Sequence, residues 1–177
     1  MIEIFPYSKD HQEGVVSVIL AIQREEFGIP VTLADQPDLL DIQGFYQRGE
    51  GNFWIAVSDG QVVGTISLLD IGNRQGALRK MFVKEPFRGA VHGVARRLLD
   101  VLLSWCSERS VSEIYLGTTA KFLAAHRFYE KNGFSEIGQL QLPPAFPVMA
   151  VDTRFYMHRL QKRMPNNALP RCEDALA

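Results

Sequence analysis

The stretch from residue 77 to residue 108 constrains the fold most, because it changes from strand to helix periodicity across one short turn. Residues 77–83 are typical of a strand, and a turn that contains Gly89 and Gly93 follows. Residues 93–108 then repeat apolar pairs every three to four positions, which indicates a long amphipathic helix. A strand, a turn and a helix in succession predict an α/β (α+β) domain in which helices pack on a sheet.

The remaining chain extends this pattern. Asp59 and Gly60 separate two β-branched runs, which is a strong signal for a β-hairpin. Apolar spacing predicts two early helices, and Asp35 is the expected N-cap of the second. Helices are expected over residues 11–27, 35–49 and 122–131, and strands over residues 2–7, 53–58, 61–70, 112–117, 136–140 and 153–160. Together they predict a mixed sheet with helices on both sides.

The chain of 177 residues predicts one domain, over residues 1–160, followed by a polar and loosely ordered tail over residues 161–177. A net charge of −1 gives no general attraction to nucleic acid or to an anionic membrane, so an anionic ligand must be held locally. We find no leader segment and no run of roughly 18 apolar residues. The two cysteines form no disulfide or metal pattern. These features favour a cytoplasmic location and predict no metal.

The two-glycine turn is a candidate phosphate site. Glycines between a strand and a helix let backbone N–H groups approach a phosphate, and the helix dipole favours the same anion. Arg88 adds a possible charge-assisted contact. The alternative is a tight turn that needs glycine for steric reasons alone.

A second group of residues lies on the helix expected over residues 122–131. Tyr129 stands near the end of this helix, and His126 lies one turn before it, so the two side chains are neighbours. On the residues alone, Phe128 and Tyr129 are interpreted as core aromatics rather than as catalytic groups.

Taken in order, these stretches resemble the GNAT N-acetyltransferase family over about residues 1–160. The marks are Met81-Phe-Val, Arg88-Gly89 followed by Gly93-Val-Ala95, and Phe128-Tyr-Glu-Lys-Asn-Gly-Phe134. The resemblance implies a GNAT-type mixed, mostly antiparallel central sheet of about seven strands flanked by about four helices. It also implies acetyl-CoA as cofactor and direct transfer of the acetyl group to a primary amine within a ternary complex.

The resemblance further implies roles for particular residues. The backbone of residues 81–83 would pair with the pantetheine arm and supply a donor for the developing oxyanion. The turn would wrap the pyrophosphate, and Tyr129 would protonate the leaving thiolate. The expected cofactor-binding residues are Met81, Phe82, Val83, Arg88, Gly89, Ala90, Val91, His92, Gly93, Val94, Ala95, Phe122, Ala125, Phe128, Tyr129 and Lys131.

The chain departs from the family pattern in three places. Arg88 precedes Gly93 by five residues, so either the loop is two residues longer or Ala90 occupies the basic position; we favour the longer loop. Phe122 stands where asparagine is frequent. The strand over residues 77–83 lacks the carboxylate that some members use as general base. His126, Glu26 and a water relay therefore remain as alternatives for the base.

The first two expected helices would form one wall of the acceptor cleft, as the resemblance implies, and they are rich in carboxylates. Such a wall would attract a small-molecule amine or a peptide amine that is cationic. The alternative is a set of capping and solvated carboxylates. Phe146, in a Pro-rich loop, would close the opposite side. The expected wall residues are Glu25, Glu26, Asp35, Asp38 and Phe146.

A second functional hypothesis is a domain of the same fold that binds CoA as a sensor or interaction module without catalysis. Retention of Tyr129 favours the enzyme. A homodimer is compatible with either hypothesis.

Overall fold

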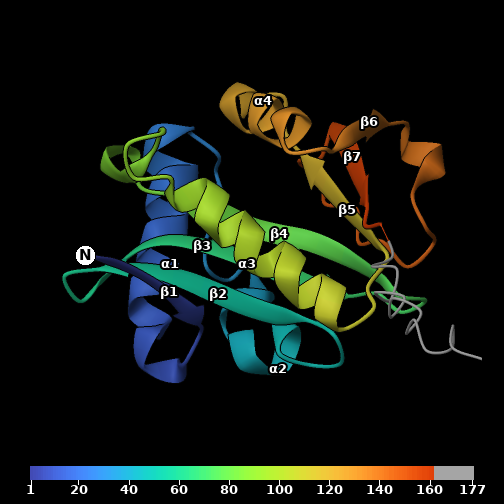
Figure 1. The fold of residues 1–177 in the computed structure, drawn as a ribbon. Coiled ribbons are helices and arrows are strands. Elements are labelled where there is room, and N and C mark those ends of the chain that lie inside the picture. The colour runs from blue at the N-terminus through green and yellow to red at the C-terminus, as the bar shows by residue number, and fades with distance from the viewer. Residues whose placement is uncertain (162–177) are drawn as a thin grey trace, which may run out of the picture.

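The computed structural model describes residues 1–161, which form a seven-stranded sheet in the order β1-β2-β3-β4-β5-β7-β6 (Figure 1). The strands are β1 Ile2–Pro6, β2 Asn52–Ser58, β3 Gln61–Asp70, β4 Gln75–Val83, β5 Glu113–Thr118, β6 Ser135–Ile137 and β7 Arg154–Arg159. All neighbouring strands are antiparallel except β4 and β5. The predicted mixed, mostly antiparallel sheet is confirmed. The tail was predicted for residues 161–177, and all of it after residue 161 lies outside the described residues.

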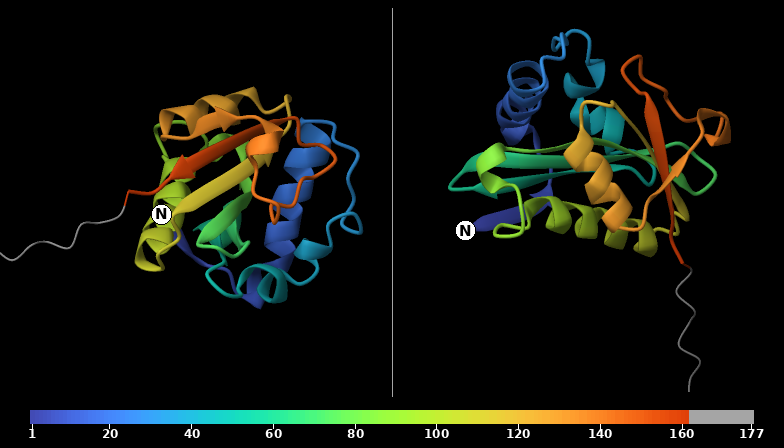
Figure 2. Two further views of the ribbon diagram at one scale, coloured as in Figure 1. Left: turned by 90° about the vertical axis from the view of Figure 1, so that its right-hand side faces the viewer. Right: turned by 90° about the horizontal axis from the view of Figure 1, so that it is seen from above.

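Helices cover both faces of the sheet. They are α1 Gln12–Leu20, α2 Ile42–Tyr46, α3 Val94–Glu108 and α4 Leu123–Lys131, and α1 continues as a π-helix over Ala21–Glu26. One apolar cluster lies under α1 and α2 and a second under α3, so these helices occupy opposite faces, as the right panel of Figure 2 shows. Within residues 1–161, no helix is long and apolar enough to cross a membrane.

The second predicted helix was wrong in its extent. Asp35 is not a helix N-cap: its carboxylate accepts hydrogen bonds from the backbone N–H and the hydroxyl of Thr32, both at 2.8 Å. Only a 3-10 turn over Pro37–Leu39 follows, and α2 begins after Asp41, whose side chain caps the N–H of Gly44. A short 3-10 turn that begins at Pro37 and a separate helix capped by Asp41 therefore replace the one continuous helix.

Strands β4 and β5 separate soon after they begin. They pair in parallel only over Gln75–Ala77 and Glu113–Tyr115. Beyond Ala77, β4 keeps its pairing with β3 while β5 keeps its pairing with β7, and Figure 1 shows the two ribbons diverging. Within the described chain, the edge of β4 over residues 78–83 that faces β5 therefore has no strand partner. We call this opening the β4–β5 splay.

A β-bulge lies in β4 beside the splay. Thr65 pairs with Phe82 and Ser67 pairs with Arg79, so two residues of β4 stand opposite one residue of β3. The first of the two, Lys80, has a positive φ of 51°. Hydroxyl groups of β3 fix the distortion, because Thr65 donates to the Lys80 carbonyl at 2.6 Å and Ser67 donates to the Arg79 carbonyl at 2.8 Å. The bulge turns Arg79 and Lys80, which are consecutive, toward the same α1–α2 face of the sheet.

Candidate active site at the splay

The two-glycine turn leads directly into α3. Gly89 and Gly93 have φ values of 82° and 58°, which favour glycine over residues with a side chain. A Cβ atom placed on either glycine would meet no other group within 4 Å, so the turn is open on its outer side. The N-terminus of α3, with its free N–H groups, follows at Val94. The turn therefore needs glycine for steric reasons and is also open to an anionic ligand.

Arg88 ties the turn to the π-helix. Its Nε donates to the carbonyl of Val83 at 2.7 Å, and both terminal nitrogens contact the carboxylate of Glu26, with Nη2 to Oε2 at 2.7 Å. The side chain of Arg88 is 36% exposed and that of Glu26 is 33% exposed, so the pair lies at the surface. Both oxygens of Glu26 are engaged, so the geometry argues against Glu26 as general base while the pair persists.

We expect Arg88→Ala to weaken CoA binding by about tenfold, the value of one charge-assisted hydrogen bond near 1.5 kcal/mol. Calorimetry with CoA and with dephospho-CoA measures this effect. Both ligands should lose affinity equally, because both contain the pyrophosphate. Loss for full CoA alone would place Arg88 on the 3′-phosphate, and unchanged affinity for both would remove it from the site. Glu26→Gln is the matched control, since it frees Arg88 and should not weaken CoA binding.

Tyr129 lies on α4 in the core that also contains α3. Its side chain packs against Phe128, Phe134 and Tyr156, with ring centroids 5.6–6.1 Å apart. Burial raises the pKa of the Tyr129 hydroxyl well above its usual value, so the phenol keeps its proton at neutral pH. Among residues 1–161 the hydroxyl has no hydrogen-bond partner, yet it is not one of the fully buried orphan atoms. The group therefore remains a protonated and available donor.

His126 is a satisfied core histidine. Its Nε2–H donates to the carbonyl of Thr119 at 3.0 Å, and its Nδ1 accepts from Nη1 of Arg154 at 2.9 Å. The ring is only 3% exposed. Because its one acceptor atom is already occupied by a guanidinium, this geometry argues against the base role that the sequence left open for His126.

The predicted acidic wall is not a single surface. Asp38 is buried, and its carboxylate accepts from the Tyr46 hydroxyl at 2.6 Å and pairs with Nζ of Lys80 at 3.2 Å. Asp35 closes its own turn, and Glu26 pairs with Arg88, which leaves Glu25 as the exposed member without a described partner. Phe146 is buried against Phe155 rather than lining a wall. The sequence shows these acidic residues, but it does not show which cationic side chains contact them in the fold.

Other predicted residues lie on β4, on the glycine turn, at the start of α3 and on α4. Phe122, at the start of α4, stacks edge-on against Phe27 at 4.6 Å and against Phe82 at 6.3 Å, so it bridges the π-helix and β4. Val94 is fully buried, and only its backbone can meet a ligand. Met81 and Phe82 are partly buried on opposite faces of β4. The exposed or partly exposed positions are Ala90, Val91, His92, Ala95, Ala125 and Lys131.

Asp152 is a candidate site residue that the sequence reasoning missed. Its carboxylate covers Gly117 of β5, where a Cβ atom would approach Oδ2 to 2.5 Å. The backbone N–H of Met149 donates to Oδ2 at 2.8 Å. Burial raises the pKa of Asp152, so its carboxylate accepts a proton more readily than that of an exposed aspartate. No motif marks this residue, because only the β5–β7 pairing brings it to the splay.

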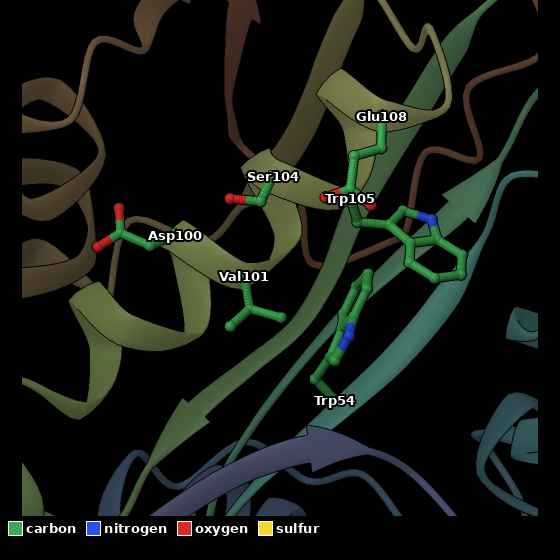
Figure 3. A pocket seen from close by; sticks show the side chains of 6 residues that line it. All are labelled: Trp54, Asp100, Val101, Ser104, Trp105 and Glu108. Atoms are coloured by element: carbon green, nitrogen blue, oxygen red, sulfur yellow. The ribbon is translucent and has the colours of Figure 1, made fainter.

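A surface pocket elsewhere takes no part in this site. It lies along the outer side of α3, where Trp54 and Trp105 pack edge to face (Figure 3). It is lined by Trp54, Asp100, Val101, Ser104, Trp105 and Glu108. On the inner side of α3, burial raises the pKa of the Cys106 thiol to about 12, so this cysteine is a core group and not a nucleophile.

Comparison with known proteins agrees with this geometry. The model of the acetyltransferase (GNAT) family matches residues 17–134. N-acetylaspartate synthetase of Danio rerio is 36% identical over 106 residues, which are 59% of this chain and 37% of that protein; the human protein is 34% identical over 135 residues, 71% and 44% respectively. The chain thus spans about two fifths of the length of these relatives.

A solved structure covers the chain more completely. The GNAT-family acetyltransferase from Staphylococcus aureus Mu50 is 41% identical, with a TM-score of 0.87, and the match covers 91% of this chain and 100% of that one. The fold, the order of the motifs and the family match therefore agree, and the chain belongs to the GNAT family of acetyltransferases.

Proposed function

We propose that this chain transfers the acetyl group of acetyl-CoA to a primary amine, directly and within a ternary complex. Acetyl-CoA is the cofactor of the family. The observation that carries the proposal is the unpaired edge of β4, which is followed by the open glycine turn and ends at Val83, in the same apolar cluster as the buried ring of Tyr129. A strand edge without a partner offers backbone N–H and carbonyl groups to an extended ligand.

The residues around the splay divide the chemistry among them. When bound, acetyl-CoA supplies the activated thioester. The turn and the N-terminus of α3 bind its phosphates, and N–H groups on the free edge of β4 stabilise the negative charge that develops on the carbonyl oxygen. Tyr129 donates a proton to the departing sulfur. This assignment places the cofactor on the α3–α4 side of the sheet.

Asp152 is the proposed proton acceptor for the amine. An amine must lose a proton to attack the thioester, and a carboxylate with a raised pKa accepts that proton more readily than an ordinary one. Its position over Gly117 faces the splay from the α1–α2 side. The acceptor therefore approaches from the face opposite to Tyr129.

Binding of the cofactor should stabilise the fold. At about a hundred times its dissociation constant, acetyl-CoA should add roughly 2.7 kcal/mol to the free energy of unfolding. For a domain of this size we expect the melting temperature to rise by about 5–10 °C. Thermal unfolding with acetyl-CoA, with CoA and with ATP as a control nucleotide measures this. An unchanged melting temperature with both CoA compounds would contradict the proposed site.

A turnover assay tests the function itself. Release of CoA is followed with a panel of primary amines that contains amino acids, polyamines and a lysine peptide. The name N-acetylaspartate synthetase, carried by relatives of this chain, supports including small amino acids. Amine-dependent release supports the enzyme. A thermal shift without release for any amine would favour the alternative of a silent CoA-binding domain. A cytoplasmic location and a homodimer remain predictions.

A further inference from the structure

Arg79 is a largely buried cation with few partners. Its side chain is 14% exposed and lies over the rings of Phe45 and Tyr46, with its guanidinium carbon 5.7 and 5.9 Å from their centroids. Among residues 1–161 its one hydrogen bond goes to the sulfur of Met149, at 3.5 Å. A guanidinium buried to this degree is normally paired with a carboxylate.

The nearest carboxylate does not satisfy Arg79. Oδ2 of Asp38 lies 4.0 Å from its Nη2, and the same oxygen lies 3.2 Å from Nζ of Lys80 and accepts from the Tyr46 hydroxyl. Two cations therefore share the carboxylate of Asp38, and Arg79 forms no hydrogen bond to it. No guanidinium nitrogen is among the fully buried orphan atoms of the described chain, so its spare donors reach accessible surface.

Arg79 stands at the start of the splay on the acceptor side. It follows Ala77, the last residue of β4 paired with β5, by two positions, and the same parallel register carried forward places it opposite Gly117. The carboxylate of Asp152 covers that glycine. Arg79 on β4 and the carboxylate of Asp152, which lies over β5 and is influenced by the charge of Arg79, thus face the same opening.

We infer that the amine acceptor carries a carboxylate close to its amine, as amino acids do, and that Arg79 binds this carboxylate while the amine faces Asp152. The inference rests on the proposed function and deepens it. Arg79 forms two parallel N–H···O hydrogen bonds to the acceptor carboxylate, and the bulge at Lys80 supplies the orientation. A polyamine is disfavoured, because it would bring a second cation beside the guanidinium of Arg79 and offer no carboxylate to it.

Matched acceptors test this. The kcat/KM of the wild type is measured for glycine and aspartate and for the corresponding α-carboxamides, each at a pH where equal fractions of the amine are neutral. We expect the acids to be preferred by about 10- to 100-fold, the range for a charged hydrogen bond. In Arg79→Gln this preference should fall to near one through a rise in KM for the acids, with the thermal shift by acetyl-CoA unchanged. Arg159→Gln, at the far end of β7, is the control and should keep the preference.

Two further measurements keep the test decisive. If Arg79→Gln unfolds, Arg79→Lys is measured in its place. Because lysine retains the positive charge, this variant should keep part of the preference for the acid. Calorimetry of the acid and the amide with CoA present detects the preference even when no acetyl transfer occurs, which separates this inference from the proposed function. Equal binding of acid and amide to the wild type, or an equal loss for both in the variants, would overturn it.

Discussion

Replacing Tyr129 by phenylalanine is expected to lower kcat about 100-fold while acetyl-CoA affinity stays unchanged. The lost hydroxyl is the proposed donor to a thiolate whose conjugate acid has a pKa near 8.5, so general acid catalysis contributes at the low end of its usual range. The raised pKa of Tyr129 keeps the donor protonated at neutral pH. The ring and its packing remain, and the hydroxyl has no internal partner among residues 1–161, so the melting temperature should change little.

Tyr115→Phe is the matched control for this variant. Tyr115 on β5 also bears a hydroxyl, but that group donates to Glu113 at 2.8 Å and lies in a different apolar cluster. Its kcat should remain at the wild-type value. An unchanged kcat in Tyr129→Phe would show that Tyr129 is a core aromatic only, and a large fall in melting temperature would show that its hydroxyl is structural.

Asp152→Asn is expected to lower kcat/KM by at least about 100-fold, because it removes the proposed proton acceptor. Burial is the main cause of the raised pKa of Asp152, and the N–H of Met149 and the charge of Arg79 oppose it. Only the ionised carboxylate accepts a proton, so wild-type activity should rise as the pH rises through this raised pKa. The variant should lack that rise.

A rate–pH profile of both proteins measures this effect, and Asp35→Asn, in an exposed turn, is the control. Because the fold disfavours the ionised form of Asp152, removing the charge should not by itself lower the melting temperature. If the acidic limb of the profile persists in Asp152→Asn, another group is the base.

The sequence predicted the parts of the fold that local signals determine. The turn at Asp59-Gly60, the strand before Gly89 and the helix after Gly93 all appear where their residues indicate. The helix expected from Asp35 does not form there, because the Asp35 carboxylate accepts hydrogen bonds from Thr32 and Asp41 caps the helix instead.

The acceptor side was not predictable from local pattern. Arg79 and Lys80 face the same side only because the β3–β4 register inserts a bulge, and the register is a property of two strands. The sequence predicts an exposed carboxylate at Asp38, yet the same bulge places the cations of Arg79 and Lys80 beside it. Asp152 reaches Gly117 through the pairing of β5 with β7. The pairing of strands that are distant in sequence therefore forms the acceptor side, for which the sequence alone predicted an acidic wall.

The destination of the acetyl group tests the central claim most directly. Protein is incubated with carbon-13-labelled acetyl-CoA and an amine accepted in the turnover assay, and mass spectrometry follows both small molecules and the intact protein. We expect the label on the nitrogen of the acceptor, in amounts equal to the CoA released, and none on the protein, because the transfer is direct. Label that remains on the thioester, or that appears on the protein while CoA is released without amine, would contradict a direct acetyl transfer at the β4–β5 splay.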